Sequence, residues 1–206
     1  MVEQSGISDL NSIPAGVRAS NGDSTRGELR VFLGYAAGVG KTYAMLEAAQ
    51  RRLSAGADIA VGYVETHQQQ ETDALLDGLE IISRREKIYR GMTLTEMDVD
   101  AVLSRQPQIV LVDDLAHTNI PDSRHPKRYL DIEDLLRKGV DVYTTVNVQH
   151  VESLNDIIVQ ITGITVDETV PDRFFDAVDQ IELIDILPED LLKRLEDGKW
   201  VICGSG

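Results

Sequence analysis

The segment Gly-Val-Gly-Lys-Thr at residues 38–42 constrains the fold of this chain more than any other feature. It follows an apolar run at residues 29–33 (LRVFL) and precedes a segment with helical spacing of apolar residues that begins at Met45. Glycines in such a loop let backbone N–H groups turn toward an anion, and the following helix directs its positive end to the same place. The order strand, loop, helix therefore predicts a phosphate-binding loop.

The first glycine of the phosphate-loop formula is displaced by one residue. Gly-x-x-x-x-Gly-Lys-Ser/Thr requires a glycine at position 35, where the chain has Tyr35, and Gly34 stands one residue earlier. We expect Gly34 to make the turn out of the strand, with Tyr35 either over the nucleotide or packed inward. The half that touches phosphate is complete, because Lys41 can reach the β- and γ-phosphates and Thr42 offers a hydroxyl to magnesium.

Six consecutive residues are the predicted nucleotide contacts. They are Gly38, Val39, Gly40, Lys41, Thr42 and Tyr43. The expected ligand is ATP with Mg²⁺, and Thr42 is one of two predicted magnesium partners. A plain strand-to-helix turn with an exposed lysine is the alternative, which the flanking strand and amphipathic helix make the weaker interpretation.

An acidic pair follows another apolar run, residues 109–112 (IVLV). A strand that ends in an acidic residue is the usual companion of a phosphate loop, because that residue holds magnesium through water. Asp113 is therefore the second predicted magnesium partner. Asp114 is the candidate catalytic residue, which either polarises a water or fixes the site. Two aspartates that cap the next turn are the alternative.

Apolar runs alternate with helical patterns along the chain, and this sets the fold class. The predicted strands are residues 29–33, 59–64, 109–114, 141–148 and 181–186, all expected to be buried. The helical patterns are Met45, Ala49 and Leu53; Leu75, Leu79 and Ile82; Leu135 and Leu136; and Leu154, Ile157, Ile158 and Ile161, with helix ends predicted at Gly56, Gly139 and Gly163. The alternation predicts an α/β fold, a three-layer P-loop NTPase-like domain with a mainly parallel sheet and helices on both faces.

Length and composition indicate one domain. A chain of 206 residues can bury one sizeable core. Residues 1–28 lack a hydrophobic period and are expected to form a disordered arm, residues 29–199 the domain, and residues 200–206 a short tail.

The net charge of −15 opposes binding to nucleic acid or anionic lipid, because both draw on clustered Lys and Arg. No segment approaches the roughly 18 apolar residues of a membrane span, and no signal sequence is evident. We therefore expect a cytoplasmic chain without direct membrane insertion. The single Cys203 fits a reducing compartment.

Weaker candidates flank these motifs. Asn147, Gln149 and His150 lie at the end of the strand at 141–148, where they could sense the γ-phosphate or a bound water; equally, His150 could open the following helix as a cap-region residue. Arg124 and Arg128 lie in a basic stretch, which is either a source of an arginine finger, in cis or across a dimer, or more commonly a solvated loop. The four histidines are not at ligand spacing, so zinc binding is not expected.

A string of motifs resembles one known family. The motifs are GVGKTYAML, GYVETH, LVDDLAHTN, SRHPKR, DVYTTVNVQHVESLND, ITGITVDETVPD and LLKRLEDGK. Together, from about Leu29 to Lys199, they are similar to the N-terminal cytoplasmic domain of the KdpD family of potassium and osmotic sensor histidine kinases. The resemblance implies an ATP-binding regulatory domain that acts in two-component signal transduction and phosphorelay. In the family this domain precedes a universal-stress-like domain, inner-membrane helices and a kinase core.

Several positions depart from the family pattern. The family usually has Ala and Pro where this chain has Tyr35 and Ala37, and its early glycine matches Gly34, which favours a real loop. Gln68 and Gln69 replace a usual Gly-Arg, and Asp114 replaces a longer Glu. The sequence ends at Gly206 without a phosphoacceptor segment, so we expect that this polypeptide is not itself a histidine kinase but a stand-alone or excised sensor domain.

Three functions remain open at this point. The first is a binding module whose ATP- and Mg²⁺-dependent conformation is read by a histidine kinase core or a response regulator of a potassium-responsive system. The second is an enzyme, a P-loop ATPase or small-molecule kinase that uses Asp113 and Asp114. The third is a homodimerising domain with a vestigial nucleotide site.

Overall fold

The computed structural model describes residues 26–67, 69–89, 91–163 and 165–196. Residues 1–25 of the predicted arm, the predicted tail and Gln68 lie outside the described residues. Residues 26–28 lie within them, and the Gly27 N–H donates to the Leu136 carbonyl at 2.8 Å.

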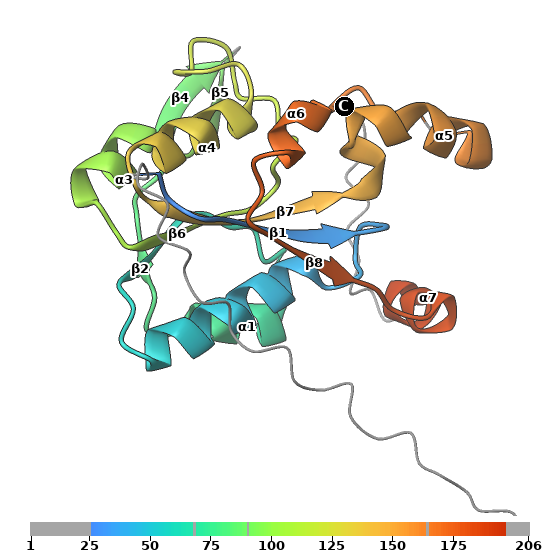
Figure 1. The fold of residues 1–206 in the computed structure, drawn as a ribbon, viewed down its shortest axis with the longest axis horizontal. Helices are drawn as coiled ribbons and strands as arrows, with labels where there is room; N and C mark the ends of the chain where they lie inside the picture. Colours follow the sequence, from blue (N-terminus) through green and yellow to red (C-terminus); the bar gives the residue numbers. More distant parts are fainter. Residues whose placement is uncertain (1–25, 68, 90, 164, 197–206) are drawn as a thin grey trace, which may run out of the picture.

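A six-stranded parallel sheet forms the centre of the molecule (Figure 1). Its strands are β1 (Leu29–Gly34), β2 (Ile59–Tyr63), β3 (Glu80–Ile81), β6 (Ile109–Val112), β7 (Asp141–Asn147) and β8 (Gln180–Ile184). They lie in the order β3-β2-β6-β7-β1-β8, and each neighbouring pair is parallel. The predicted parallel sheet is therefore confirmed.

Helices cover both faces of the sheet. They are α1 (Lys41–Ser54), α2 (Gln70–Asp73), α3 (Val99–Arg105), α4 (Arg128–Arg137), α5 (Glu152–Thr162), α6 (Asp172–Phe175) and α7 (Pro188–Glu196), with 3₁₀ turns at Ala74–Leu76 and Val148–His150. Figure 1 shows α3 to α6 on one side of the sheet and α1 and α7 on the other. The predicted helix ends at Gly56, Gly139 and Gly163 all have positive φ, as expected where a chain leaves a helix.

Both faces of β1 are largely buried, which explains its apolar run, in which Arg30 is the one charged residue. Val31 belongs to the apolar cluster that contains Ile132 of α4. Phe32 belongs to the cluster on the opposite face, which contains Met45 and Leu46 of α1. Alternate side chains of one strand thus join the two layers of helices to the sheet.

The helix predicted from Leu75, Leu79 and Ile82 is wrong over its second half. The helical segment ends at Leu76, Gly78 has a φ of 78°, and the short strand β3 follows. Leu79 and Ile82 are buried because they flank this strand. Their spacing imitated a helical period.

An antiparallel hairpin of β4 (Arg85–Tyr89) and β5 (Met92–Glu96) stands apart from the main sheet. Sequence reasoning did not predict it, because its residues are mostly polar and exposed and show no buried apolar run. Glu96, the last residue of β5, is by contrast buried.

β8 differs from its prediction as a buried strand. Ile181 and Leu183 are exposed, since β8 is an edge strand paired with β1. The predicted apolar pattern of α5 forms a helix, but α5 contains no buried residue. Among the described residues, no helix has the length and apolar character needed to cross a membrane.

Candidate functional site

The register of the parallel strands brings the predicted polar clusters to one edge of the sheet, which we call the carboxyl edge. Gly34 at the end of β1 pairs with Asn147 of β7 on one side and Ile184 of β8 on the other. Val112 at the end of β6 pairs with Thr144 of β7. The segments that follow β1, β6, β7 and β8 therefore leave the sheet side by side, where ligands bind in open α/β sheets.

Two glycines give the loop after β1 its shape. Gly38 has a φ of 81° and Gly40, the residue that caps α1, has a φ of 100°. Side chains with a Cβ are strained in this region, so the two glycines are required by the backbone. Val39 between them is buried and holds the loop against the core.

Gly34 is needed for close approach, which corrects the role expected for it. It is the last residue of β1, and it is not among the glycines with positive φ. A Cβ at this position would lie 2.6 Å from Val39 Cγ2 and 2.8 Å from Lys41 Cδ. The missing side chain therefore makes room for the lysine stem.

Lys41 is the first residue of α1 and points back along its own loop. Its ammonium donates to the Ala36 carbonyl at 3.0 Å. Burial lowers the pKa of Lys41, while the nearby carboxylates of Asp113 and Asp114 act in the opposite direction. The lysine is thus held close to both acids.

Asp113 is the most enclosed charged group at this edge, with 7% of the residue exposed. Thr42 Oγ1 donates to its Oδ2 at 3.0 Å, and Thr145 Oγ1 of β7 donates to its Oδ1. Burial, together with the charge of Asp114, raises the pKa of Asp113. The structure thus brings the two predicted magnesium partners, Thr42 and Asp113, into direct contact.

Asp114 is exposed and has a φ of 58°, a conformation that aspartate tolerates better than most residues. Its N–H is shared between Asp113 Oδ1 and Thr145 Oγ1, both at 3.2 Å. The turn thereby directs the backbone of Asp114 toward the buried acid.

Two tyrosines of the loop and of α1 are partly exposed at this edge. Tyr35 donates its hydroxyl to the carbonyl of Ile186, which follows β8, at 3.0 Å. The ring therefore lies toward β8 and is not packed inward. Tyr43 is exposed on the first turn of α1.

The three polar residues at the end of β7, Asn147, Gln149 and His150, make different kinds of contact. Oδ1 of Asn147 is buried and has no hydrogen-bond partner among the described residues. The ring of His150 pairs through Nδ1 with the Glu168 carbonyl at 2.7 Å, and the Gln149 carbonyl accepts from Asn155. The His150 side chain therefore has a structural contact, the contact given for Gln149 is made by its backbone, and Asn147 offers a buried side-chain acceptor.

Arg128 belongs to the core and does not lie in a solvated loop. It donates to the Asp113 carbonyl at 3.1 Å and to Glu96 Oε2 at 3.0 Å, and its guanidinium lies 3.9 Å from the centre of the Tyr63 ring. Arg124 binds Asp100 at 2.6 Å and Asp134 at 3.0 Å. These contacts give neither arginine a position as a finger in cis.

Glu96 ties the hairpin to the acidic strand end. His117 Nε2 lies 2.9 Å from its Oε1, and the Ile120 N–H donates to the same oxygen at 3.0 Å. Burial opposes ionisation, but these hydrogen bonds and the charge of Arg128 hold the pKa of Glu96 below its ordinary value. Sequence reasoning missed Glu96 and Thr145, although a threonine pair inside an apolar strand was a visible signal.

Among the residues that the structure describes, no three His, Cys, Asp or Glu side chains form a group that could hold a metal ion. The contact of Thr42 with Asp113 supplies two protein oxygens, which suits Mg²⁺, an ion that commonly keeps several waters and binds through one or two carboxylates and substrate phosphates.

Fold and site together define an α/β domain with a glycine loop and an acidic strand end on one edge of a parallel sheet. Comparison with known proteins identifies its family. Residues 25–202 match the family described as KdpD, osmosensitive K⁺ channel His kinase sensor domain. The chain belongs to this family.

The similar proteins are much longer. The chain is 56% identical over 180 residues to sensor protein KdpD of Escherichia coli, and 55% identical over 177 residues to that of Clostridium acetobutylicum. These matches cover 87% and 86% of this chain and 20% of each relative. A sensor protein KdpD of Mycobacterium tuberculosis is 54% identical over 173 residues, which cover 84% of this chain and 20% of that protein. The chain therefore spans about one fifth of the length of these relatives.

Proposed function

We propose that this domain is P-loop NTPase-like, binds ATP with Mg²⁺ at the carboxyl edge, and passes the bound state to a signalling partner. The observation that carries the proposal is the contact between Thr42 and Asp113. These residues come from α1 and from the end of β6, 71 positions apart, and their side chains meet at 3.0 Å beside Lys41. A lysine, a hydroxyl and an acid are the groups that an NTP–Mg²⁺ complex requires.

The loop suits a polyphosphate. The positive φ values of Gly38 and Gly40 shape a backbone that admits phosphate close to the main chain, and α1 adds the positive end of a 14-residue helix. Lys41 is bound to a carbonyl of its own loop. A phosphate oxygen would give this ammonium a charged acceptor, which forms a stronger hydrogen bond than a carbonyl does.

The acidic side suits the metal. Mg²⁺ bound with ATP bridges phosphate oxygens and neutralises their charge. Thr42 and Asp113 would hold it, and Thr145 fixes the Asp113 carboxylate from β7. A cation there would also favour the ionised form of Asp113, whose pKa burial raises.

The signalling role rests on the family. The relatives are named sensor proteins, and the family name refers to an osmosensitive K⁺ channel His kinase. We infer that the domain regulates a potassium-responsive two-component system from the cytoplasmic side. Its partner is a histidine kinase core or a response regulator, and the ATP-bound conformation is the signal.

Calorimetric titration of Mg-ATP tests the nucleotide site. We expect Lys41→Ala to weaken binding by about 2 to 4 kcal/mol, because it removes a charge-assisted contact to phosphate. Lys138→Ala is the matched control, since Lys138 is exposed just before β7 begins, at the opposite edge of the sheet. Equal affinities of the wild type and Lys41→Ala would refute the site.

One observation favours a second candidate, an ATPase or small-molecule kinase. Asp114 is exposed beside Asp113, and the buried Oδ1 of Asn147 has no described partner. These two groups could orient a water or another nucleophile. Arg124 and Arg128 are bound to carboxylates elsewhere, however, so the site lacks their help in stabilising transition-state charge.

A further inference from the structure

The carboxyl edge has a direction, because β1 separates two different sides. On one side lie β7 and β6, with Asp113 and Asn147; we call this the β6 side. On the other side lies β8, followed by residues 185–187; we call this the β8 side. In a bound NTP–Mg²⁺ complex, the metal and Lys41 engage the β- and γ-phosphates. The γ end therefore points to the β6 side, and the nucleoside end extends across β1 toward the β8 side.

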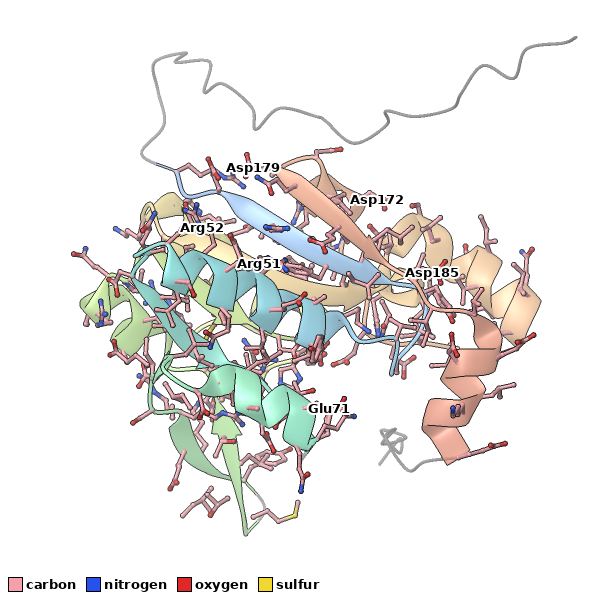
Figure 2. All side chains as sticks on the ribbon, turned by 90° about the horizontal axis from the view of Figure 1, so that it is seen from below. Arg51, Arg52, Glu71, Asp172, Asp179 and Asp185 are labelled. Atoms are coloured by element: carbon pink, nitrogen blue, oxygen red, sulfur yellow. The ribbon has the colours of Figure 1, made fainter. Side chains whose placement is uncertain are left out.

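The β8 side offers an exposed aromatic surface at this place. Tyr35 is 36% exposed, and its hydroxyl is bound to the Ile186 carbonyl at 3.0 Å. Leu187, the next residue, is 67% exposed. Both figures show the loop after β1 beside the connection from β8 to α7, and Figure 2 marks that connection by Asp185.

We propose that Tyr35 is the stacking platform for the purine base of the bound nucleotide, with Leu187 at the rim of the platform. The inference rests on the proposed nucleotide site and adds the position and chemistry of its base subsite. The hydrogen bond to Ile186 orients the ring toward β8. The base therefore gains apolar and π contact without leaving the edge on which the phosphates bind.

Stacking determines what the subsite can distinguish. Every base has a π-face, so an aromatic platform contributes affinity with little discrimination between bases of the same size. ATP and GTP should therefore bind within a few-fold of each other through this contact. Inorganic triphosphate carries the phosphates without a base and is the probe that separates the two ends of the site.

The experiment titrates the 206-residue chain with ATP and with inorganic triphosphate, both with Mg²⁺. We expect the wild type to bind ATP about tenfold more tightly than triphosphate. Tyr35→Ala should lose about tenfold in ATP affinity and leave triphosphate affinity unchanged. Tyr35→Phe keeps the ring but loses the hydroxyl that orients it, so it should lose less ATP affinity than Tyr35→Ala does and should bind triphosphate like the wild type.

Tyr89→Ala is the matched control, because Tyr89 is also 36% exposed but lies on the β4–β5 hairpin. Its affinities should equal those of the wild type. Unchanged ATP affinity in Tyr35→Ala, or an equal loss for both ligands, would overturn the base platform and leave the phosphate site intact. A wild-type chain that bound neither ligand would refute the nucleotide site itself, and this inference with it.

Discussion

The two sides of the carboxyl edge differ in how firmly their groups are held. On the β6 side, the Asp113 carboxylate is buried and accepts hydrogen bonds from Thr42 and Thr145. On the β8 side, Tyr35 and Leu187 are partly or largely exposed, and the Tyr35 hydroxyl is bound to a backbone carbonyl. The β6 side holds an enclosed charge, and the β8 side carries exposed apolar side chains next to the exposed Asp185.

The fold must prearrange the β6 side of the site before the β8 side. A carboxylate taken out of water is costly unless its partners are fixed, so the β6 side has to be complete before a ligand arrives. An aromatic ring can remain half-exposed at little cost and adapt to a base on binding. We therefore expect substitutions of the buried groups on the β6 side to change both stability and binding, and substitutions on the β8 side to change binding alone.

The largest loss of stability is expected for a substitution of Arg128, whose guanidinium binds the Asp113 carbonyl on the β6 side. Arg128→Met removes the buried partner of Glu96 and the donor to the Asp113 carbonyl. Leaving a buried charge without its partner costs about 3 to 5 kcal/mol. Urea denaturation should show a loss of this size in the free energy of unfolding.

Arg124→Met is the control from the same basic stretch. The Arg124 side chain is 42% exposed in its ion pairs with Asp100 and Asp134, and such pairs contribute at most about 1 kcal/mol. Equal losses for the two substitutions would show that the buried network around Arg128 does not support the acidic strand end.

A smaller effect of opposite sign is expected for Asp113→Asn. The variant should lose magnesium-dependent ATP binding, but in EDTA at neutral pH it should be more stable than the wild type by about 0.5 to 2 kcal/mol, because it removes a buried functional charge whose ionised form burial disfavours. Asp114→Asn changes an exposed side chain and should stay within about 0.5 kcal/mol of the wild type.

The stability gain of Asp113→Asn should depend on pH in a direction that follows from the pKa of Asp113. Burial raises the pKa of Asp113 in the folded chain above the ordinary value of 3.8. Over the interval between these two values the folded state holds the proton that the unfolded state has lost, so the ionisation of Asp113 lowers stability as pH rises. The advantage of Asp113→Asn should therefore grow as pH rises through that interval. An advantage independent of pH would mean that another cause dominates.

The sequence predicted the centre of this molecule well, because central parallel strands are buried on both faces. The runs that became β1, β2, β6 and β7 were recognisable without any partner in view. The loop and the acids were predictable for a similar reason, since their chemistry depends on neighbours in the chain. Register then brought them together.

The parts that were missed depend on distant contacts. Arg128 is buried because its guanidinium donates to Glu96, 32 residues away, and lies over the ring of Tyr63. No local sequence pattern distinguishes it from a solvated arginine. The burial of β8 was overestimated because edge position is a property of the whole sheet. The role of Gly34 was mistaken because a close approach of Lys41 cannot be seen in the chain alone.

The smallest expected effect concerns what happens to bound ATP. A good ATPase needs a group that aligns water and a cation that stabilises transition-state charge, and the cation can contribute 10³-fold or more. On the β6 side, Asp114 is a short, exposed carboxylate, and Arg124 and Arg128 bind carboxylates elsewhere. We therefore expect the chain to hydrolyse ATP more slowly than about one per minute, below the ~1 s⁻¹ low end of typical enzymes.

Asp114→Asn should then change turnover by less than about threefold, because a site without transition-state stabilisation has little rate to lose. Steady-state phosphate release with saturating Mg-ATP measures this, and Lys41→Ala supplies the background of a chain that does not bind. Many turnovers per second that disappear in Asp114→Asn would make this domain an enzyme. In that case the β6 side would be a catalytic centre, and the β8 side would contribute binding alone. Slow turnover that Asp114→Asn leaves unchanged would instead mean that both sides are parts of one binding site.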